Sequence, residues 1–126
     1  MKIQSLDHLV LTVNKIEESI HFYSNILGMQ YILFGDNRHA LKFGEQKINL
    51  HQSDNIFQPS AKSPTSGSAD LCFIVKTPVE QIVSELSEAG IDIVEGPIKR
   101  TGAIGEILSV YIRDPDMNLI ELSNKL

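Results

Sequence analysis

The chain has 126 residues, a length that suits one compact domain with a real hydrophobic core. Apolar residues make up 42% of it and the formal net charge is −5, so no nucleic-acid partner is expected. The first eight residues lack the apolar core of a signal peptide, and no apolar run approaches the roughly 18 residues of a membrane span. Cys72 is the single cysteine, which excludes an intrachain disulfide, and the cytoplasm is the expected compartment.

The first expected element is a strand over residues 8–13, where apolar side chains alternate with the others. One face of this strand is therefore apolar, and the other begins with the imidazole of His8. A helix is expected next, because Asn14 and Glu17 form a capping box and Gly28 fits the left-handed stop of a helix. Its buried face has four members at helical spacing: Ile16, Ile20, Tyr23 and Leu27.

Three short strands over residues 30–34, 39–43 and 47–51 are expected to follow, separated by turns at 35–37 and 44–46. The first module, about residues 4–51, is therefore β-α-β-β-β. Residues 52–69 form a polar connector that contains Pro59, Pro64 and five serines. This connector is too long for a tight turn, so a role as a lid or at an interface is open.

A second module, about residues 70–124, repeats this order. A strand over 70–76 leads to Thr77 as the helix N-cap and Pro78 as the first helical residue. Strands are expected over 91–95, 107–113 and 118–123, with a turn at 114–117. The helix ends at Gly90, and its apolar stripe consists of Val79, Ile82, Val83 and Leu86.

The two modules place polar residues at matching positions. His8 and Asp70 open equivalent strands at an offset of 62 (70 − 8), which also relates Gly28 to Gly90 (90 − 28). His51 and Glu121 match at an offset of 70 (121 − 51), so the register changes by eight (70 − 62), and we interpret residues 99–106 as a loop insertion. Each strand alternates its faces, so all four side chains are expected on the faces turned away from the helices.

Two imidazoles and two carboxylates at repeated positions form a candidate metal site. Such a donor set suits Zn²⁺, Ni²⁺, Mn²⁺, Co²⁺ or Fe²⁺, and four protein ligands leave room for water or a chelating substrate. Each residue alone is more often a surface or hydrogen-bonded side chain. The metal site is favoured because the four residues occupy equivalent positions in the two modules.

Three segments have sequences similar to those of a known protein superfamily: residues 7–13, residues 22–29 and residues 113–121. On these, the chain resembles the vicinal oxygen chelate superfamily, which includes glyoxalase I, bleomycin-resistance proteins, extradiol dioxygenases and fosfomycin-resistance proteins. The segments 47–51, 67–72 and 100–103 look most like the small glyoxalase-domain-containing proteins, among them bacterial virulence proteins.

The resemblance implies an α+β fold in which two βαβββ modules form curved mixed sheets around a central cavity, and it implies a divalent metal and a homodimer. His8, His51, Asp70 and Glu121 match the family's four metal-ligand positions. Glyoxalase I has the order His, Glu, His, Glu, so imidazole and carboxylate are exchanged here. Extradiol dioxygenases have His at the third position, where this chain has Asp70. Met117 stands where the family's turn usually has Gly.

The function expected from these residues is that of a metal-dependent lyase or isomerase of glyoxalase type. Its small substrate would chelate the metal through two adjacent oxygens. Glu121 is the first choice as catalytic base, because a carboxylate can leave a metal and take a proton, and Asp70 is the second. Two alternatives are an extradiol-type dioxygenase and a non-catalytic protein that binds an antibiotic or another small molecule.

Substrate-binding candidates come from three further residues. Arg38 and Arg100 are suited to a carboxylate or phosphonate, although solvated surface charges are the commoner alternative. Cys72, two residues after Asp70, shares its cavity side, although a buried structural cysteine is the commoner alternative. Tyr111 and its neighbour Ser109 could line the same cavity, and the sequence does not fix which way they face.

Overall fold

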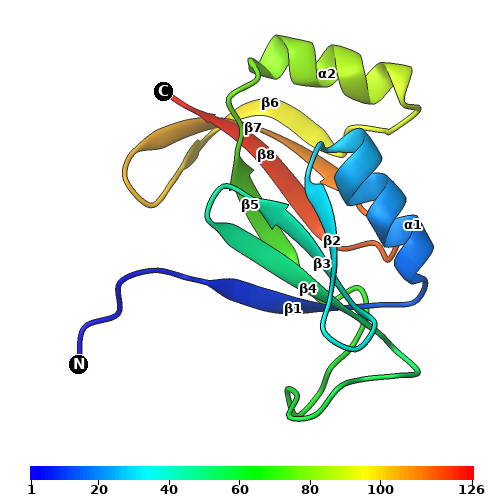
Figure 1. Cartoon of the computed structure of the whole chain (residues 1–126). Helices are drawn as coiled ribbons and strands as arrows, with labels where there is room; N and C mark the ends of the chain where they lie inside the picture. Colours follow the sequence, from blue (N-terminus) through cyan, green and yellow to red (C-terminus); the bar gives the residue numbers. More distant parts are fainter. The chain divides into compact units, whose positions relative to one another are not determined.

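A computed structural model describes all residues of the chain, 1–126. The chain forms two compact units, Met1–Ser68 and Ala69–Leu126. Each unit contains a four-stranded mixed sheet with helical structure between its first and second strands (Figure 1). The predicted α+β fold with two βαβββ modules is confirmed. None of the helices is long and apolar enough to cross a membrane.

In the first unit the strand order is β1-β4-β3-β2. The strands are β1 (His8–Val13), β2 (Gln30–Phe34), β3 (Arg38–Phe43) and β4 (Gln46–Gln52), and β1 runs parallel to β4 while the other pairs are antiparallel. Between β1 and β2, helix α1 (Ile16–Ile20) continues into the π-helical segment η1 (His21–Ile26). All four strands lie where the sequence predicts them, within one residue at each end.

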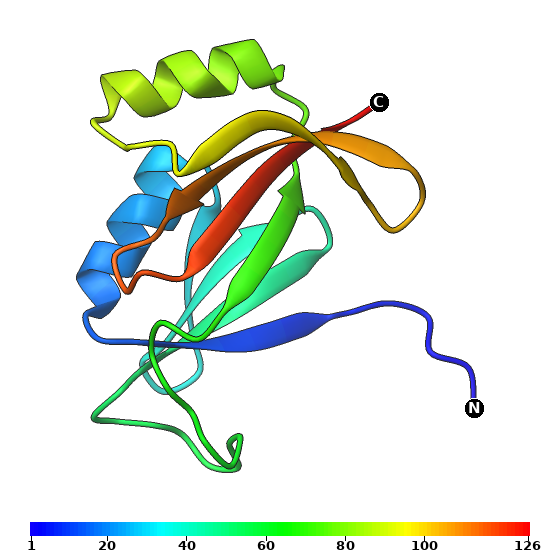
Figure 2. The same cartoon turned by 180° about the vertical axis from the view of Figure 1, so that it is seen from behind.

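In the second unit the strand order is β5-β8-β7-β6. The elements are β5 (Asp70–Ile74), α2 (Val79–Glu88), β6 (Glu95–Thr101), β7 (Glu106–Arg113) and β8 (Leu119–Lys125), with β5 parallel to β8. Helix α2 packs on β7 and β8 and covers one face of this sheet (Figure 2). The opposite face carries the polar residues of the unit.

Each sheet buries the face that the alternation of its sequence predicts. On β1, Val13 is fully buried, whereas Val10 on the other face is 48% exposed. The core of the first unit consists of Leu11, Val13, Phe22, Tyr23, Leu41, Ile48 and Leu50. The core of the second unit consists of Val79, Ile82, Leu86, Ile107, Val110, Ile112, Ile120 and Leu122.

The sequence prediction is wrong for the third stretch of the second module. Residues 91–94 do not form a strand, Glu95 begins β6, and residues 99–101, interpreted as part of a loop insertion, belong to the same strand. Gly96 and Pro97 lie within β6, and the sheet accommodates them in a register shift between Glu95 and Ile98. Gly96 has φ +107, and a Cβ there would lie 2.4 Å from the Ser109 carbonyl oxygen, so only glycine fits this bulge.

The predicted helix caps are also wrong. The N-caps are Lys15 for α1 and Pro78 for α2, and neither has a side-chain cap. The backbone N–H groups that lack a partner at a helix start are instead reached from the last strand of the same unit. In the first unit Gln52 Oε1 accepts a bond from Ile16 N at 3.5 Å.

The corresponding cap of α2 is made by Asn124 of β8. Its Oδ1 accepts a bond from Val79 N at 2.8 Å, and its Nδ2 donates to the carbonyl oxygens of Val75 and Thr77, both at 2.9 Å. Gln52 and Asn124 lie 72 residues apart (124 − 52). The duplicated unit therefore includes an amide side chain that ties its last strand to its helix.

Replacing Asn124 by alanine should lower the free energy of unfolding by roughly 2 to 4 kcal/mol, because one helix donor and two partly buried carbonyls lose their partner. Urea denaturation followed by circular dichroism measures this change. The matched variant Gln52→Ala loses one long bond and should destabilise by about 1 kcal/mol or less. If the two substitutions lowered the free energy of unfolding equally, the three Asn124 hydrogen bonds would stabilise the fold no more than the single Gln52 bond.

Candidate functional site

The parallel pairing inside each unit fixes which residues are equivalent. His8 pairs with Lys47 and Asp70 pairs with Leu119, so the ends of the two modules are related by 72 residues (119 − 47). The predicted offset of 70 is therefore wrong by two residues. The counterpart of Glu121 is Asn49 (121 − 72), and His51 corresponds to Ser123.

The structure does not bring the two predicted histidine ligands together within the first unit. His8 pairs with Lys47 whereas His51 pairs with Thr12, so the two lie four residues apart along neighbouring parallel strands (12 − 8). At about 3.3 Å per residue this separation is roughly 13 Å. Zinc–nitrogen bonds are about 2.0 to 2.1 Å long, so one ion would not be reached by both rings without distortion.

His8 is exposed at the start of β1 and is oriented by its neighbour. The Asp7 carboxylate lies 2.8 Å from His8 Nδ1. Histidines that bind metals commonly donate one ring N–H to a carboxylate, which leaves the other nitrogen as the ligand. Because the Asp7 carboxylate occupies Nδ1, Nε2 is the ring nitrogen of His8 left to bind a ligand.

His51 lies in a different environment on β4. Its side chain is buried, at 4% exposed, and Nε2 has no hydrogen-bond partner. Phe57 of the connector packs edge-on against the imidazole with 5.3 Å between centroids, and Arg38 Cζ lies 5.0 Å from the same Phe57 ring. Burial lowers the pKa of His51, and the Arg38 guanidinium lowers it further, so this imidazole is held neutral.

On the polar face of the second unit the structure brings the predicted carboxylates near each other. Glu121 lies directly opposite Cys72 in the register, and Asp70 is two residues before Cys72 on the same face. Asp70 is exposed, whereas Glu121 Oε1 is buried and has no hydrogen-bond partner. A buried carboxylate oxygen without a partner is unfavourable unless a donor or a cation binds it.

Cys72 is exposed, and the alternative of a buried structural cysteine is wrong. Its Sγ lies 3.4 Å from Ser123 Oγ, which in turn lies 2.7 Å from Ser109 Oγ. Loss of solvent around the thiol raises the pKa of Cys72, and the Glu121 and Asp70 charges add to this, while the Ser123 bond opposes it. Because the thiolate is the nucleophile, Cys72 is a weak nucleophile at neutral pH.

Tyr111 and Arg100 form a connected pair next to Glu121. The register places Tyr111 opposite Glu121, which settles the facing that the sequence left open. Arg100 Nε donates to Tyr111 Oη at 3.0 Å, and Arg100 Nη2 donates to Glu95 Oε1 at 3.3 Å. Burial raises the pKa of Tyr111 and the Glu121 carboxylate adds to this, whereas the Arg100 bond acts in the opposite direction. Tyr111 is therefore a protonated donor at neutral pH.

The sequence analysis missed Glu95, because it placed this residue at the end of a strand over 91–95, whereas Glu95 is the first residue of β6. It also missed Asn49, the true counterpart of Glu121. The signal for Asn49 was present, since it shares a strand face with His51, but an amide is a less conspicuous candidate ligand than an imidazole. Asn49 is 5% exposed and its Oδ1 has no hydrogen-bond partner.

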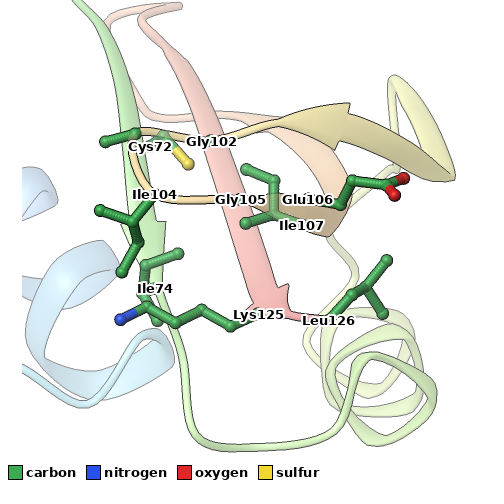
Figure 3. A pocket seen from close by; sticks show the side chains of 10 residues that line it. Cys72, Ile74, Gly102, Ile104, Gly105, Glu106, Ile107, Lys125 and Leu126 are labelled. Carbon is green, nitrogen blue, oxygen red and sulfur yellow. The ribbon is translucent and has the colours of Figure 1, made fainter.

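A cavity of about 540 Å³ opens on the same face of the second unit. Figure 3 shows the Cys72 sulfur and the Lys125 amine among apolar side chains and the glycines of the turn between β6 and β7. The volume is in the range of small-molecule pockets, which are mostly apolar with a few polar groups. Its lining consists of Cys72, Ile74, Gly102, Ala103, Ile104, Gly105, Glu106, Ile107, Lys125 and Leu126.

The donors of this chain fit a divalent cation in type. Asp70 and Glu121 supply carboxylates, one of them with a buried unpartnered oxygen, and His8 supplies an oriented imidazole. Within either unit, however, no three His, Cys, Asp or Glu side chains gather closely enough to hold an ion.

The family model of the glyoxalase/bleomycin resistance protein/dioxygenase superfamily matches residues 5–122. The chain belongs to this superfamily, and the resemblance seen in its sequence is confirmed. It is 60% identical to virulence protein STM3117 of Salmonella typhimurium, over 98% of this chain and 85% of that protein. It is 52% identical to the glyoxalase domain-containing protein RDO1 of Mycosarcoma maydis (98% and 70% covered) and 30% identical to the metallothiol transferase FosB of Staphylococcus epidermidis (97% and 82% covered).

Solved structures agree with this assignment. The crystal structure of STM3117 covers both chains completely, with a TM-score of 0.98 and 59% identity. More distant structures share the fold alone. They include a lactoylglutathione lyase from Agrobacterium tumefaciens (TM-score 0.76, 20% identity, 98% and 96% covered) and TnmS3, an antibiotic-binding protein from a Streptomyces species (TM-score 0.78, 19% identity, 100% and 99% covered).

The lowered pKa of His51 predicts a loss of stability in acid. Below the ordinary histidine pKa of about 6.5, His51 is protonated in the unfolded chain but stays neutral in the folded chain. The free energy of unfolding therefore falls as pH decreases through this range. Above pH 6.5 His51 is neutral in both states, so it causes no such loss of stability there. Urea denaturation at about pH 7.5 and about pH 5.5 measures the difference.

The substitution His51→Gln should reduce this acid-dependent loss, because glutamine does not titrate. The matched substitution His21→Gln removes an exposed histidine of η1 and should leave the loss as in the wild type. If both variants show the wild-type pH dependence, His51 is not the residue whose protonation opposes folding.

Proposed function

We propose that the protein is a divalent-metal-dependent enzyme of glyoxalase type, a lyase or isomerase acting on a small molecule with two adjacent oxygen atoms. The observation that carries the proposal is the buried Glu121 oxygen without a partner, beside an apolar cavity and a protonated phenol. Membership of the superfamily supports it, as do the names of two similar proteins, a metallothiol transferase and a lactoylglutathione lyase.

The ligands in this proposal are His8, Asp70 and Glu121. Of the four residues predicted from the sequence, His51 is given a different role, because it does not share the register of Glu121 and lies beside the Arg38 charge. When bound, a divalent ion would supply Lewis-acid polarisation of the substrate oxygens. Zinc, nickel, manganese, cobalt and iron all suit a mixed set of imidazole and carboxylate ligands.

Glu121 is the proposed base, with Asp70 as the second choice. The carboxylate lies beside the Tyr111 hydroxyl and the Cys72 thiol, and its buried Oε1 is the oxygen proposed to accept a proton from a substrate carbon or hydroxyl. Tyr111 Oη, fixed by the Arg100 bond, is placed beside Glu121 to donate a hydrogen bond to a developing negative oxygen.

The cavity next to these groups is proposed to hold the remainder of the substrate. Its largely apolar lining suits the apolar part of a substrate, and the Cys72 thiol at its edge is protonated and acts as a contact. Arg100 has its guanidinium divided between Tyr111 and Glu95, so it positions Tyr111 more directly than it binds a substrate anion.

A second candidate function is non-catalytic binding of a small apolar molecule. The size and apolar lining of the cavity favour it, and one protein of the same fold is named as antibiotic-binding. Metal content separates the two functions, because sequestration in an apolar cavity needs no ion. The proposed enzyme is also a homodimer, for which the mass in solution is the check.

Protein purified without chelators should contain about one divalent ion per chain by elemental analysis. The variant Glu121→Gln should keep the fold, lose metal affinity and lower the rate with methylglyoxal and glutathione by at least roughly a hundredfold, the scale of a lost general base. The matched variant Glu88→Gln, at the exposed end of α2, should change neither quantity. Because His51 is not a ligand in this proposal, His51→Gln should retain the metal.

Full activity of Glu121→Gln would remove this residue from the mechanism. A wild-type protein that binds small molecules but contains no ion would favour the sequestration function. Metal loss in both His51→Gln and His8→Gln would restore the four-ligand set that the sequence predicts.

A further inference from the structure

The polar face of the first unit holds cations that the proposed enzyme does not use. Arg38 and Lys42 lie on this face of β3, and Lys42 stands directly opposite Lys47 of β4. Like charges at opposed positions of an antiparallel pair destabilise a sheet. None of these three side chains takes part in an ion pair. The face therefore carries positive charge that no protein carboxylate neutralises.

Aromatic rings hold two of these cations at fixed positions. Lys47 Nζ lies 4.0 Å from the centre of the Phe34 ring, and Arg38 Cζ lies 5.3 Å from the same centre. Phe34 is on β2, so the Lys47 side chain crosses β3, where the small residue Ala40 leaves room. Phe57 contacts Arg38 from the connector, at 5.0 Å. Cation–π contacts orient the charges without neutralising them.

Two buried polar side chains lie on the same face. His51 and Asn49 are only 4% and 5% exposed. The buried atoms His51 Nε2 and Asn49 Oδ1 both lack a hydrogen-bond partner. Native proteins rarely leave such atoms unpaired, because each loses its hydrogen bonds to water. His51 contacts the ring of Phe57 that also carries Arg38, so an unpartnered imidazole lies beside an unpaired guanidinium.

We propose that this face of the first unit binds a small oxyanion, the phosphate or carboxylate group of a small molecule, through Arg38, Lys47 and His51. The Arg38 guanidinium offers a planar pair of donors that matches two oxygens of such a group. The Lys47 ammonium supplies a second charge, and the neutral His51 ring donates through Nε2 in the tautomer that carries its proton there. The inference goes beyond the proposed function, because it requires no metal ion.

The same arrangement accounts for the position of His51. A divalent cation at Nε2 would lie among positive charges, which is electrostatically unfavourable, whereas an anion at this atom is attracted by both cations. The two modules share their strands and caps, but Arg38, Lys42 and Lys47 on the first polar face give way on the second to a mixture of acidic and basic residues. A role in anion binding therefore explains why His51 does not follow the register of Glu121.

The test is calorimetric titration of the metal-free protein with inorganic phosphate and, separately, with acetate, at constant ionic strength and after removal of metal with a chelator. Saturable binding of either anion supports the site, and the anion that binds more tightly identifies the source of the oxygens. The variant Arg38→Gln should weaken this binding about tenfold or more, since a fixed charged donor is lost. Arg38→Lys should give a smaller loss, because it keeps the charge without the forked geometry.

Lys62→Gln is the matched control: it removes one positive charge from the exposed connector and should leave the affinity unchanged. Circular dichroism of each variant confirms that it is folded before titration. A second readout is the nitrogen chemical shift of the His51 ring, which should move with phosphate in the wild type and not in Arg38→Gln.

The absence of saturable binding of both anions by folded wild-type protein would overturn the inference. So would an unchanged affinity in Arg38→Gln, because the anion would then bind elsewhere. The outcome is separable from that of the proposed function. Failure to find a metal leaves this titration unaffected, and failure to bind phosphate leaves the metal content of the wild type unaffected.

Discussion

The parallel pairing of the first strand of each module with its last strand is the constraint on which both candidate sites depend. In this pairing directly opposed residues share a face, so one register assigns every side chain of the pair to the helix side or the polar side. The pairs His8 with Lys47 and Asp70 with Leu119 therefore decide which polar residues can meet. The amide caps made by Gln52 and Asn124 connect the same last strands to the helices and support this register.

The sequence contained enough information to predict the faces but not the register. Alternation has a period of two residues, so offsets of 70 and 72 place the same side chains on the same face. Apolar periodicity and the glycine stops fixed the helices and the first four strands, and Gly28 and Gly90 have the expected positive φ. The pairing partner of a strand is set by distant residues, which no local pattern encodes. His51 could therefore be matched to Glu121 when Asn49 was the true counterpart.

The other errors have local physical causes. Gly96 and Pro97 are turn residues in most contexts, but in β6 they form a bulge against Ser109 that keeps the strand paired. The helix caps were expected from neighbouring residues, whereas the structure supplies them from strands more than thirty residues away, as the Gln52 bond to Ile16 illustrates. Cys72 was placed on the correct face, but its exposure depends on how much of that face neighbouring side chains cover.

The two duplicated modules share their architecture but differ in the residues of their polar faces. Helix stops, strand order and caps are common to both modules because each module must bury its own helix on its own sheet. The polar faces carry no such requirement. In the second unit, Asp70, Glu95 and Glu121 share a face with Arg100, Arg113 and Lys125, and Tyr111 and Glu95 hold Arg100.

In the first unit, Arg38, Lys42 and Lys47 occupy the corresponding face with no acidic partner. The charged side chains of the first face are therefore all basic, whereas the second face mixes acidic and basic ones, and each face retains a buried polar atom without a hydrogen-bond partner. The burial of each helix on its own sheet constrains the strands, stops and caps of both modules alike, whereas the residues of the polar faces are free of that constraint and differ between the modules.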